Sequence, residues 1–525
     1  METYDIILIG SGHNALITAA YLTSAGRSVL VLEKNDRPGG YLRTEALTLP
    51  GFTHDVYAAA HPLFLTGPAY ADLGKDLEAH GLKYVNTDLP TGVSMEDGRT
   101  AVLPRSFEAL IAEAERLAPG DGTALARMFE NINPYVNDVF GLFNVDLSTP
   151  EASAVMARLM GTPTFAASMF STARHVVSPF QSPVMRAMFA SWVTHLGSTP
   201  DEIGSGIWVP LTAMGLMGGG MPTPEGGSEM LAQSLAQLVV DQGGVIHTHT
   251  LVQTIIVEHG RAVGVRTADG HTFRAAQAVV ACTTPDQLYL SLLAETEIDP
   301  PLRKQAAQFR YGRGCVQIHL ALSEPPRWPD ERFNKVGQPH LTDGLDGCIL
   351  AVAQGMADLL PVKPTFTVDC STNLDPTRAP EGKAIMRVQV LDVPIRPRGD
   401  AAGQIDVGDG TWTHDLTERF TERVLDVVSK HIPNIPSAVI GKHIITPDSI
   451  AKFNPNAGPG DPYGGAHDLA QSYTLRPLPS QPSHQTTVPN LYMLGAATWP
   501  GHGINGGSGY IVAQKLLAAV GAVKA

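Results

Sequence analysis

The residues of this chain that are best spaced for chemistry are glycines. Gly10 and Gly12 lie between the apolar run Tyr4–Ile9 and a helix-like stretch, Asn14–Ala25, whose second residue is the small Ala15. In such a turn the first glycine permits a tight bend, the second lets the backbone approach a pyrophosphate, and a small third residue keeps the helix close to the strand. The free N–H groups at the start of the helix attract phosphate. The stretch therefore predicts a dinucleotide-binding turn.

An acidic residue completes this unit after the next predicted strand, Ser28–Leu32. Glu33 lies 21 residues beyond Gly12, where a carboxylate can accept hydrogen bonds from both ribose hydroxyls and would repel a 2′-phosphate. This favours the adenosine of FAD or NAD over that of NADP. The paired glycines Gly39 and Gly40 follow in "RPGGYLRT". A plain NAD-binding domain gives no reason for paired glycines at this position, whereas a longer cofactor that extends along the domain does.

A second glycine-rich stretch, "GHGINGGSGYIVAQKLL", begins at Gly501 and also has the G-x-G-x-x-G spacing. A second dinucleotide site would need a strand leading into the turn and an acid about 20 residues further on. Pro500 interrupts the approach, and Ala525 is the last residue. We therefore expect this stretch to form the far wall of the site that begins at Gly10. The helix after it would bring the positive end of its dipole to a flavin that becomes anionic on reduction.

A middle section contains a further series of predicted elements. An Asp-Gly pair between strand-like runs indicates a hairpin, because a type I′ turn needs positive φ at both central residues. The last run would return to the main sheet. The predicted order is a helix over Ser228–Gln242, a strand over Val245–Thr248, two turns at His259-Gly260 and Asp269-Gly270, and a returning strand at Val279–Ala281.

These motifs resemble the FAD-dependent amine oxidase and phytoene desaturase superfamily, and are most similar to its phytoene-desaturase-like oxidoreductases. The resemblance rests on "GSGHNAL", "PGGYLRT" and "LYMLGAATWPGHGINGGSG". It is clear at the start of the chain, in the middle section and at the end, and weak in the segments that separate these three parts. It implies an α/β fold with a Rossmann-type FAD-binding domain, in which a parallel sheet and a β-meander come from segments 1–70, 225–290 and 485–525. A mixed α+β substrate domain would come from segments 71–224 and 291–484.

The resemblance also implies which residues contact FAD. The backbone of Val252 would hold the adenine edge, unless Val252 is only a sheet residue. The expected contacts are Gly10, Gly12, His13, Asn14, Ala15, Glu33, Lys34, Gly39, Gly40, Arg43, Val252, Gly495, Gly503, Ile504 and Asn505.

Four side chains are candidates for catalysis. His502 and Trp499 stand in a motif that the superfamily more often writes T-H-P-G-G-G, and a histidine there could deprotonate a substrate or hydrogen-bond to a carbonyl. Tyr57 and His61 lie in "GFTHDVYAAAHPLF", which the resemblance places beside the flavin. A packing role stays open for each. The sequence has no zinc motif, catalytic triad or P-loop.

The resemblance implies an FAD-dependent dehydrogenase or desaturase that moves hydride from a largely apolar organic substrate to flavin N5, with oxygen, a quinone or another carrier as electron acceptor. An amine oxidase, an isomerase or saturase, and a cofactor-free escort protein of small GTPases are the alternatives. The retained glycines and Glu33 oppose the last of these.

Composition limits the partners. With 525 residues the chain exceeds the size of a single core, about 250 to 300 residues, and its net charge of −14 opposes binding to nucleic acid. The 4 cysteines form no C-x-x-C pair, so we expect free thiols. No signal peptide and no apolar run of about 18 residues is present, which predicts a soluble cytoplasmic protein. Peripheral membrane contact and the oligomeric state stay open.

Three stretches of the expected substrate domain are ambiguous. Five methionines between Met156 and Met188 could line a pocket or pack in the core. Ala213–Gly220, "AMGLMGGG", could be a flexible loop or a tight turn. Tyr463, His467 and Arg476 could form the cavity wall or serve packing.

Overall fold

The first elements of the chain form the predicted strand–helix–strand unit. In the computed structural model, which describes residues 2–521, β1 (Glu2–Ile9), α1 (His13–Ser24) and β2 (Val29–Leu32) follow one another, and the two strands are parallel. Ile6–Ile9 of β1 and all of β2 are apolar and buried, as expected for the centre of a parallel sheet. Residues 1 and 522–525, part of the predicted segments 1–70 and 485–525, lie outside the described residues.

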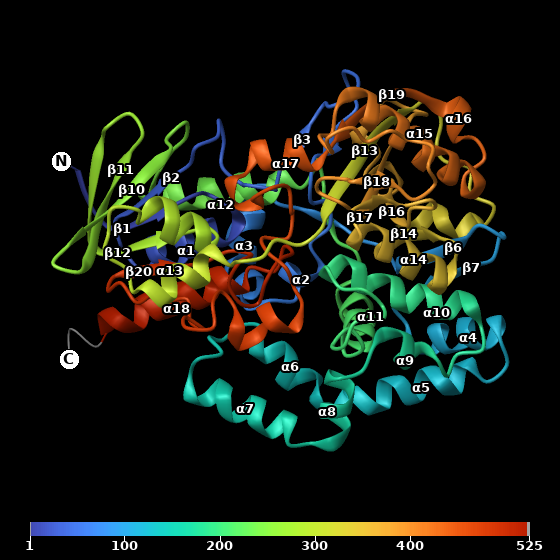
Figure 1. Cartoon of the computed structure of the whole chain (residues 1–525), viewed down its shortest axis with the longest axis horizontal. Helices are drawn as coiled ribbons and strands as arrows, with labels where there is room; N and C mark the ends of the chain where they lie inside the picture. Colours follow the sequence, from blue (N-terminus) through green and yellow to red (C-terminus); the bar gives the residue numbers. More distant parts are fainter. Residues whose placement is uncertain (1, 522–525) are drawn as a thin grey trace.

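A seven-stranded sheet is built around this unit (Figure 1). Strands β9, β2, β1, β12 and β20 are parallel neighbours, and β10 and β11 form a meander with β12. The α/β fold with a parallel sheet and a β-meander is thus confirmed. The other strands of this sheet are β9 (Val245–His247), β10 (Val252–Glu258), β11 (Arg261–Thr267), β12 (Thr272–Ala281) and β20 (Leu491–Met493).

The meander has the two predicted turns, but they differ in geometry. His259 and Gly260 both have positive φ, as a type I′ turn requires. At the second turn only Gly270 does, so the type I′ prediction for Asp269-Gly270 is wrong. The Gly270 N–H donates to the Thr267 carbonyl at 3.0 Å, and the Asp269 carboxylate accepts from the Thr267 hydroxyl. An aspartate that hydrogen-bonds locally can keep negative φ and leave the left-handed position to glycine.

Helix α18 (Gly507–Gly521) brings the end of the chain against α1. Asn14 Oδ1 accepts from the Gly509 N–H at 3.0 Å, and the Thr18 hydroxyl donates to the Gly509 carbonyl at 2.8 Å. A Cβ at Gly509 would lie 2.3 Å from the Asn14 carbonyl oxygen, so only glycine allows this close approach. The two glycine-rich stretches of the sequence therefore meet at one end of the first sheet.

A second seven-stranded sheet lies on the opposite side of the molecule (Figure 1). Its order is β19-β13-β17-β16-β14-β6-β7, and apolar residues of one face pack against α15 (His414–His431). The strands of this sheet are β6 (Leu89–Met95), β7 (Thr100–Leu103), β13 (Gly314–Leu322), β14 (Val336–Thr342), β16 (Phe366–Asp369), β17 (Ala384–Val393) and β19 (Val439–Ile445).

A group of helices lies along the bottom of Figure 1, with α10 and α4 below the second sheet and α6 and α7 below the middle of the molecule. Met185 and Met188 are buried in its core, whereas Met160 is partly exposed. The loop or turn predicted over Ala213–Gly220 is wrong, because α11 continues to Gly219, where a Cβ would lie 3.2 Å from the Pro62 carbonyl of α2. The helices are α4 (Phe107–Leu117), α5 (Asp121–Ile132), α6 (Val136–Leu142), α7 (Pro150–Met160), α8 (Pro163–Met169), α9 (Ala173–Val177), α10 (Pro183–Ala190), the 3₁₀ helix Ser191–Leu196 and α11 (Trp208–Gly219).

The remaining elements connect these parts. The predicted helix over Ser228–Gln242 is confirmed as α12, to within a residue at each end. Cys282, Cys315, Cys348 and Cys370 are free, as predicted. Within residues 2–521 none of the helices combines the length and apolar character that a bilayer crossing requires. The other elements are α2 (Pro62–Leu65), α3 (Pro68–Ala79), α12 (Glu229–Asp241), α13 (Pro300–Ala307), α14 (Gly344–Met356), α16 (Ile435–Ala438), α17 (Pro447–Phe453) and the strand pairs β3 (Thr44–Glu45) with β4 (His54–Asp55), β5 (Tyr84–Val85) with β8 (Thr223–Pro224), and β15 (Leu359–Leu360) with β18 (Gly399–Asp400).

Candidate active site

One cavity of about 760 Å³ is lined by residues of both sheets and of the helical group. Ile9 comes from the first sheet, Gln317 from the second and Trp208 from α11. Its volume lies in the range of small-molecule and cofactor sites, about 300–1,000 Å³. Predicted site residues on the wall are Gly10, Gly12, His13, Asn14, Glu33, Lys34, Gly40, Tyr57, Val252, Gly495, Trp499, His502, Gly503 and Ile504.

The glycine turn before α1 has the features that a bound diphosphate needs. Gly10 has a φ of +89°, and no side chain caps the N–H groups of the first turn of α1. A Cβ at Gly40, whose φ is +59°, would lie 3.3 Å from the Gly12 Cα, so the two glycine loops can approach only without side chains. Free N–H groups and an open approach to the backbone form an anion site.

Glu33 lies beside this turn at the end of β2. Its Oε2 accepts from the Ser11 N–H at 3.0 Å and from the Ser11 hydroxyl at 2.6 Å, and its Oε1 accepts from the Asn35 N–H at 2.9 Å. The side chain is nearly buried, yet it lines the cavity. The Glu33 carboxylate therefore holds the glycine turn through hydrogen bonds and also faces the cavity.

Three predicted cofactor contacts near the first turn lie off the cavity wall. Ala15 is fully buried in the core under the turn. Gly39 has a φ of +125° and donates its N–H to the Ser11 carbonyl at 3.0 Å. The guanidinium of Arg43 pairs with Asp36 and Glu45. These residues shape the loops, and the structure gives no direct contact between them and the cavity.

The C-terminal glycine turn closes the other side of the cavity. Gly495, Gly503 and Ile504 line it. Asn505 does not: its Oδ1 accepts from the Gly507 N–H at 2.8 Å and its Nδ2 donates to the His502 carbonyl at 3.0 Å. The side chain of Asn505 thus holds the turn in shape at the start of α18.

A cluster of histidines surrounds His502. His502 Nε2 donates to the His195 carbonyl at 2.7 Å, and its Nδ1 lies 2.9 Å from His467 Nε2. Burial lowers the pKa of His502 to about 4, so it is neutral at pH 7 and Nδ1 accepts from His467. The His195 ring stacks on Trp192 and its Nε2 lies 3.1 Å from His340 Nε2. His195 and His467 line the cavity together with His502.

The other candidates for catalysis differ in their access to the cavity. Tyr57 lines it, and burial raises the pKa of its hydroxyl, so it stays protonated. Trp499 lines it and donates its ring N–H to the Leu142 carbonyl at 2.7 Å. His61 is fully buried away from the wall, with its ring nitrogens 2.9 Å from Tyr84 Oη and from Ser228 Oγ. The structure therefore gives no support to a catalytic role for His61.

Arg476 and Tyr463, for which a wall position or a packing role was open, both line the cavity. Arg476 is also a structural residue. Its guanidinium donates to the carbonyls of Gly464, Ala466 and Ala496, so it joins two loops that approach the glycine turn.

Sequence reasoning missed most of the wall that the second sheet and the helical group contribute. These residues are far apart in the chain and belong to no recognisable motif. For the residues of β13 and β17, the alternate polar positions along the strand are a sequence signal. They include Phe140, Phe143, Trp192, His195, Trp208, Gln317, Gln338, Arg387, Gln389, Leu391 and Tyr473.

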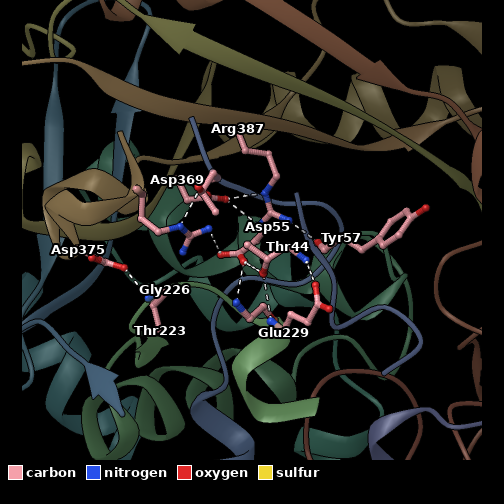
Figure 2. Close-up of polar contacts among 12 residues, drawn as sticks. Thr44, Asp55, Tyr57, Thr223, Gly226, Glu229, Asp369, Asp375 and Arg387 are labelled. Atoms are coloured by element: carbon pink, nitrogen blue, oxygen red, sulfur yellow. Dashed lines mark hydrogen bonds and ion pairs between the residues drawn. The ribbon is translucent and has the colours of Figure 1, made fainter. Parts of the chain in front are cut away.

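A buried polar network next to Tyr57 joins the segment around β4 to the start of α12 and to the second sheet (Figure 2). Asp55 Oδ1 accepts from the Ser228 N–H at 2.7 Å and from the Thr44 hydroxyl at 2.9 Å, and Oδ2 lies 3.1 Å from Arg378 Nη2. The side chains of Asp55 and Arg378 are 2% and 1% exposed. Burying either charge alone would cost free energy, so the opposite charge and the hydrogen bonds to Asp55 must compensate for that cost.

A second ion pair lies beside the first, between Arg387 of β17 and Asp369 of β16. Arg387 Nη2 lies 2.7 Å from Asp369 Oδ2, and Arg387 Nη1 donates to the Tyr57 carbonyl. Figure 2 shows Asp55 and Arg387 close to the segment that carries Tyr57. The second sheet thus holds this part of the cavity wall through charged groups.

Comparison with known proteins identifies the family. Residues 16–517 match the model of one protein family, described as flavin containing amine oxidoreductase. The chain belongs to this family. It is 26% identical to a limonene dehydrogenase subunit of Castellaniella defragrans, over 97% of this chain and 94% of the relative. It is also 26% identical to a neurosporene-forming phytoene desaturase of Cereibacter sphaeroides, over 97% and 93%.

A solved structure shows the same fold. An oxidoreductase from Methanosarcina mazei superposes with a TM-score of 0.62 at 17% identity, covering 99% of this chain and 100% of that chain. Together with the family, this makes the protein an FAD-dependent oxidoreductase, with a substrate and an electron acceptor. The uncapped start of α1, the glycine approach and the Glu33 carboxylate fit the phosphates and ribose of FAD.

The buried histidines of this family member make its stability depend on pH. Burial lowers the pKa of His502 to about 4 and those of His61 and His340 to about 3, from 6.5. Between pH 6.5 and 4 the unfolded chain binds protons at these histidines and the folded protein does not. We therefore expect the free energy of unfolding to fall on acidification, by about 1.4 kcal/mol per pH unit for each histidine.

Denaturant unfolding of the flavin-loaded protein at pH 7.5, 6.5, 5.5 and 4.5 would measure this. In His502→Gln the free energy of unfolding should fall less steeply on acidification, by the contribution of about one histidine. In His175→Gln, at an exposed position, the pH dependence should be unchanged. A His502→Gln profile parallel to that of the wild type would contradict the expectation.

Proposed function

We propose that this protein is an FAD-dependent dehydrogenase that removes hydride and a proton from adjacent carbons of a largely apolar organic substrate. Bound FAD would accept the hydride. The observation that carries the proposal is an aromatic wall next to the C-terminal glycine turn, which consists of Phe140, Phe143, Trp208, Tyr473 and Trp499.

The rings of this wall form one continuous apolar surface. The Trp499 ring centroid lies 5.3 Å from that of Phe143 and 5.6 Å from that of Tyr473, and Phe143 lies 6.0 Å from Trp208. Because the Trp499 N–H is taken by the Leu142 carbonyl, its ring offers the cavity an apolar face. Such a surface favours a hydrocarbon-rich ligand over a small polar one.

The relatives support the same class of reaction, since two of them are named as a limonene dehydrogenase subunit and a phytoene desaturase. For an amine oxidase we would expect aromatic rings with space for an amine between them. At the glycine turn, the His467 and His502 rings are instead in edge-to-face contact, with their centroids 4.3 Å apart, and are hydrogen-bonded to each other. This arrangement favours dehydrogenation at carbon.

Anaerobic mixing of the purified flavoprotein with candidate substrates tests the proposal. We expect loss of the flavin absorbance with an alicyclic hydrocarbon, an alicyclic ketone or a polyene, and none with the amine of the same skeleton. The proposal fails if amines alone reduce the flavin, or if the protein carries no flavin and cannot be reconstituted with FAD. The electron acceptor can then be identified by adding oxygen or a quinone to the reduced protein.

A further inference from the structure

The second sheet presents two chemically different faces. On one face, Val316, Ile318 and Val388 pack with the apolar side of α15. On the other, the alternate residues Gln317 and Gln389 line the cavity. A sheet that served only as a wall for a hydrocarbon would be expected to carry apolar residues on both faces.

The polar residues form a row across four strands. Gln317 of β13 is paired with Gln389 of β17, Gln389 with Thr367 of β16, and Thr367 with His340 of β14. Directly paired residues of antiparallel strands project to the same face. Gln338, two residues before His340, also lines the cavity, so three primary amides face one space.

These amides retain hydrogen-bonding capacity. Each can make up to four hydrogen bonds, as two donors and an acceptor with two lone pairs. Within residues 2–521, Gln317 Oε1 lies 3.4 Å from Arg387 Nη1, and Gln338 Nε2 donates to Thr367 Oγ1 at 3.3 Å. The Gln389 amide also contacts the Cys315 thiol. The donors and acceptors that these contacts leave are available to a molecule in the cavity, and leaving them without a partner when an apolar molecule displaces water would be costly.

The row carries no free charge. Arg387 also lines the cavity, but Asp369 and the Tyr57 carbonyl engage its guanidinium. His195, whose Nε2 contacts His340, borders the same wall and is neutral, since burial lowers its pKa. A set of neutral donors and acceptors matches a neutral oxygen group better than an ammonium or a carboxylate.

We propose that the face formed by Gln317, Gln338 and Gln389, here called the amide face, binds a neutral carbonyl or hydroxyl oxygen of the substrate. The substrate is then an oxygenated apolar molecule, a ketone or alcohol with a hydrocarbon body against the aromatic wall. This inference rests on the proposed dehydrogenation, because that function makes the bound molecule a substrate. It narrows the substrate from apolar organic molecules in general to oxygenated ones.

The test measures binding to the oxidised flavoprotein, separately from turnover. The probes share one carbon skeleton: limonene, the ketone carvone, the alcohol carveol, and an amine and a carboxylic acid of the same ring. Dissociation constants come from perturbation of the flavin spectrum and from equilibrium dialysis. We expect carvone or carveol to bind about 10-fold more tightly than limonene, a difference that one or two net hydrogen bonds can supply.

Two variants locate the effect. Gln389→Leu and Gln317→Leu should bring the carvone-to-limonene ratio close to one, because the oxygen loses its partners while the cavity keeps its volume. Leu391→Ala is the matched control, since Leu391 lines the same face of β17, and it should weaken both probes alike. Flavin content and thermal midpoint verify that each variant is folded.

The proposal is overturned if limonene binds as tightly as carvone and carveol, if the amine or the acid binds most tightly, if the Gln→Leu variants keep the wild-type ratio, or if no oxygenated probe binds. The proposed dehydrogenation is judged by a different readout, anaerobic flavin reduction. An oxygen preference that disappears in the variants, without flavin reduction by any probe, would reject dehydrogenation and retain the amide face.

Discussion

Replacing Arg378 with Met is expected to lower the free energy of unfolding by about 3–5 kcal/mol, since it leaves the Asp55 carboxylate buried without its cation. Arg378 also pairs with Thr53, whose N–H donates to the Arg378 carbonyl at 2.8 Å and whose carbonyl accepts from Arg378 Nε at 3.1 Å. The loss should therefore affect the contact between the β4 segment and the segment that carries Arg378. Denaturant and thermal unfolding of the FAD-loaded protein would measure it.

Two further variants make this expectation specific. Arg99→Met removes an ion pair to Asp97 in which both side chains are 49% exposed, and it should cost less than about 1 kcal/mol. In the double variant Asp55→Asn, Arg378→Met neither charge remains, so part of the stability should return. A single Arg378→Met variant as stable as Arg99→Met, or a double variant whose loss of stability equals the sum of the losses in Arg378→Met and Asp55→Asn, would show that the pair is not coupled.

Glu33→Ala is expected to weaken FAD binding by about 10- to 100-fold, as the loss of hydrogen bonds to a charged group predicts. The carboxylate lies at the end of β2 on the cavity wall, and it also braces the turn through Ser11 and Asn35. Both the ribose contact and the shape of the turn depend on it. Flavin retention on dilution and the dissociation constant for FAD of the apoprotein give the measurement.

Ser11→Ala separates the two roles of Glu33. It removes the hydroxyl that donates to Glu33 Oε2 at 2.6 Å but leaves the carboxylate and the Ser11 N–H in place. If the main role is ribose binding, Ser11→Ala should weaken FAD much less than Glu33→Ala. Equal losses would assign the effect to the turn, and unchanged flavin occupancy in Glu33→Ala would contradict the ribose assignment.

Much of the first sheet could be predicted because its signals are local. The apolar run Tyr4–Ile9, the glycines after it and Glu33 follow in an order whose spacing is set by strand and helix geometry. The middle helix and the two hairpins were likewise marked by glycine and by helical periodicity. Where a prediction failed, a local or packing contact decided. Asp269 bonds to Thr267, and α11 approaches α2 at Gly219, in a stretch predicted to be a loop or turn.

The cavity wall could be predicted only in part. Residues in motifs, such as Gly10, Val252 and Gly503, do line it, whereas Gly39, Arg43 and Asn505 in the same motifs turn away to support the loops. Spacing along the chain indicates which backbone comes close to a ligand. It does not indicate which side chain is needed to hold a neighbouring loop.

By itself the sequence determined the dinucleotide turn, the acid beside it and the meander, because these depend on contacts between residues close in the chain. Only the tertiary structure decided that α1 and α18 meet at Asn14 and Gly509, that Asp55 and Arg378 form a buried pair, and that Gln317 and Gln389 face the same cavity. Those contacts join residues up to 495 positions apart. They depend on how two sheets pack and pair their strands, and no short stretch of sequence contains that information.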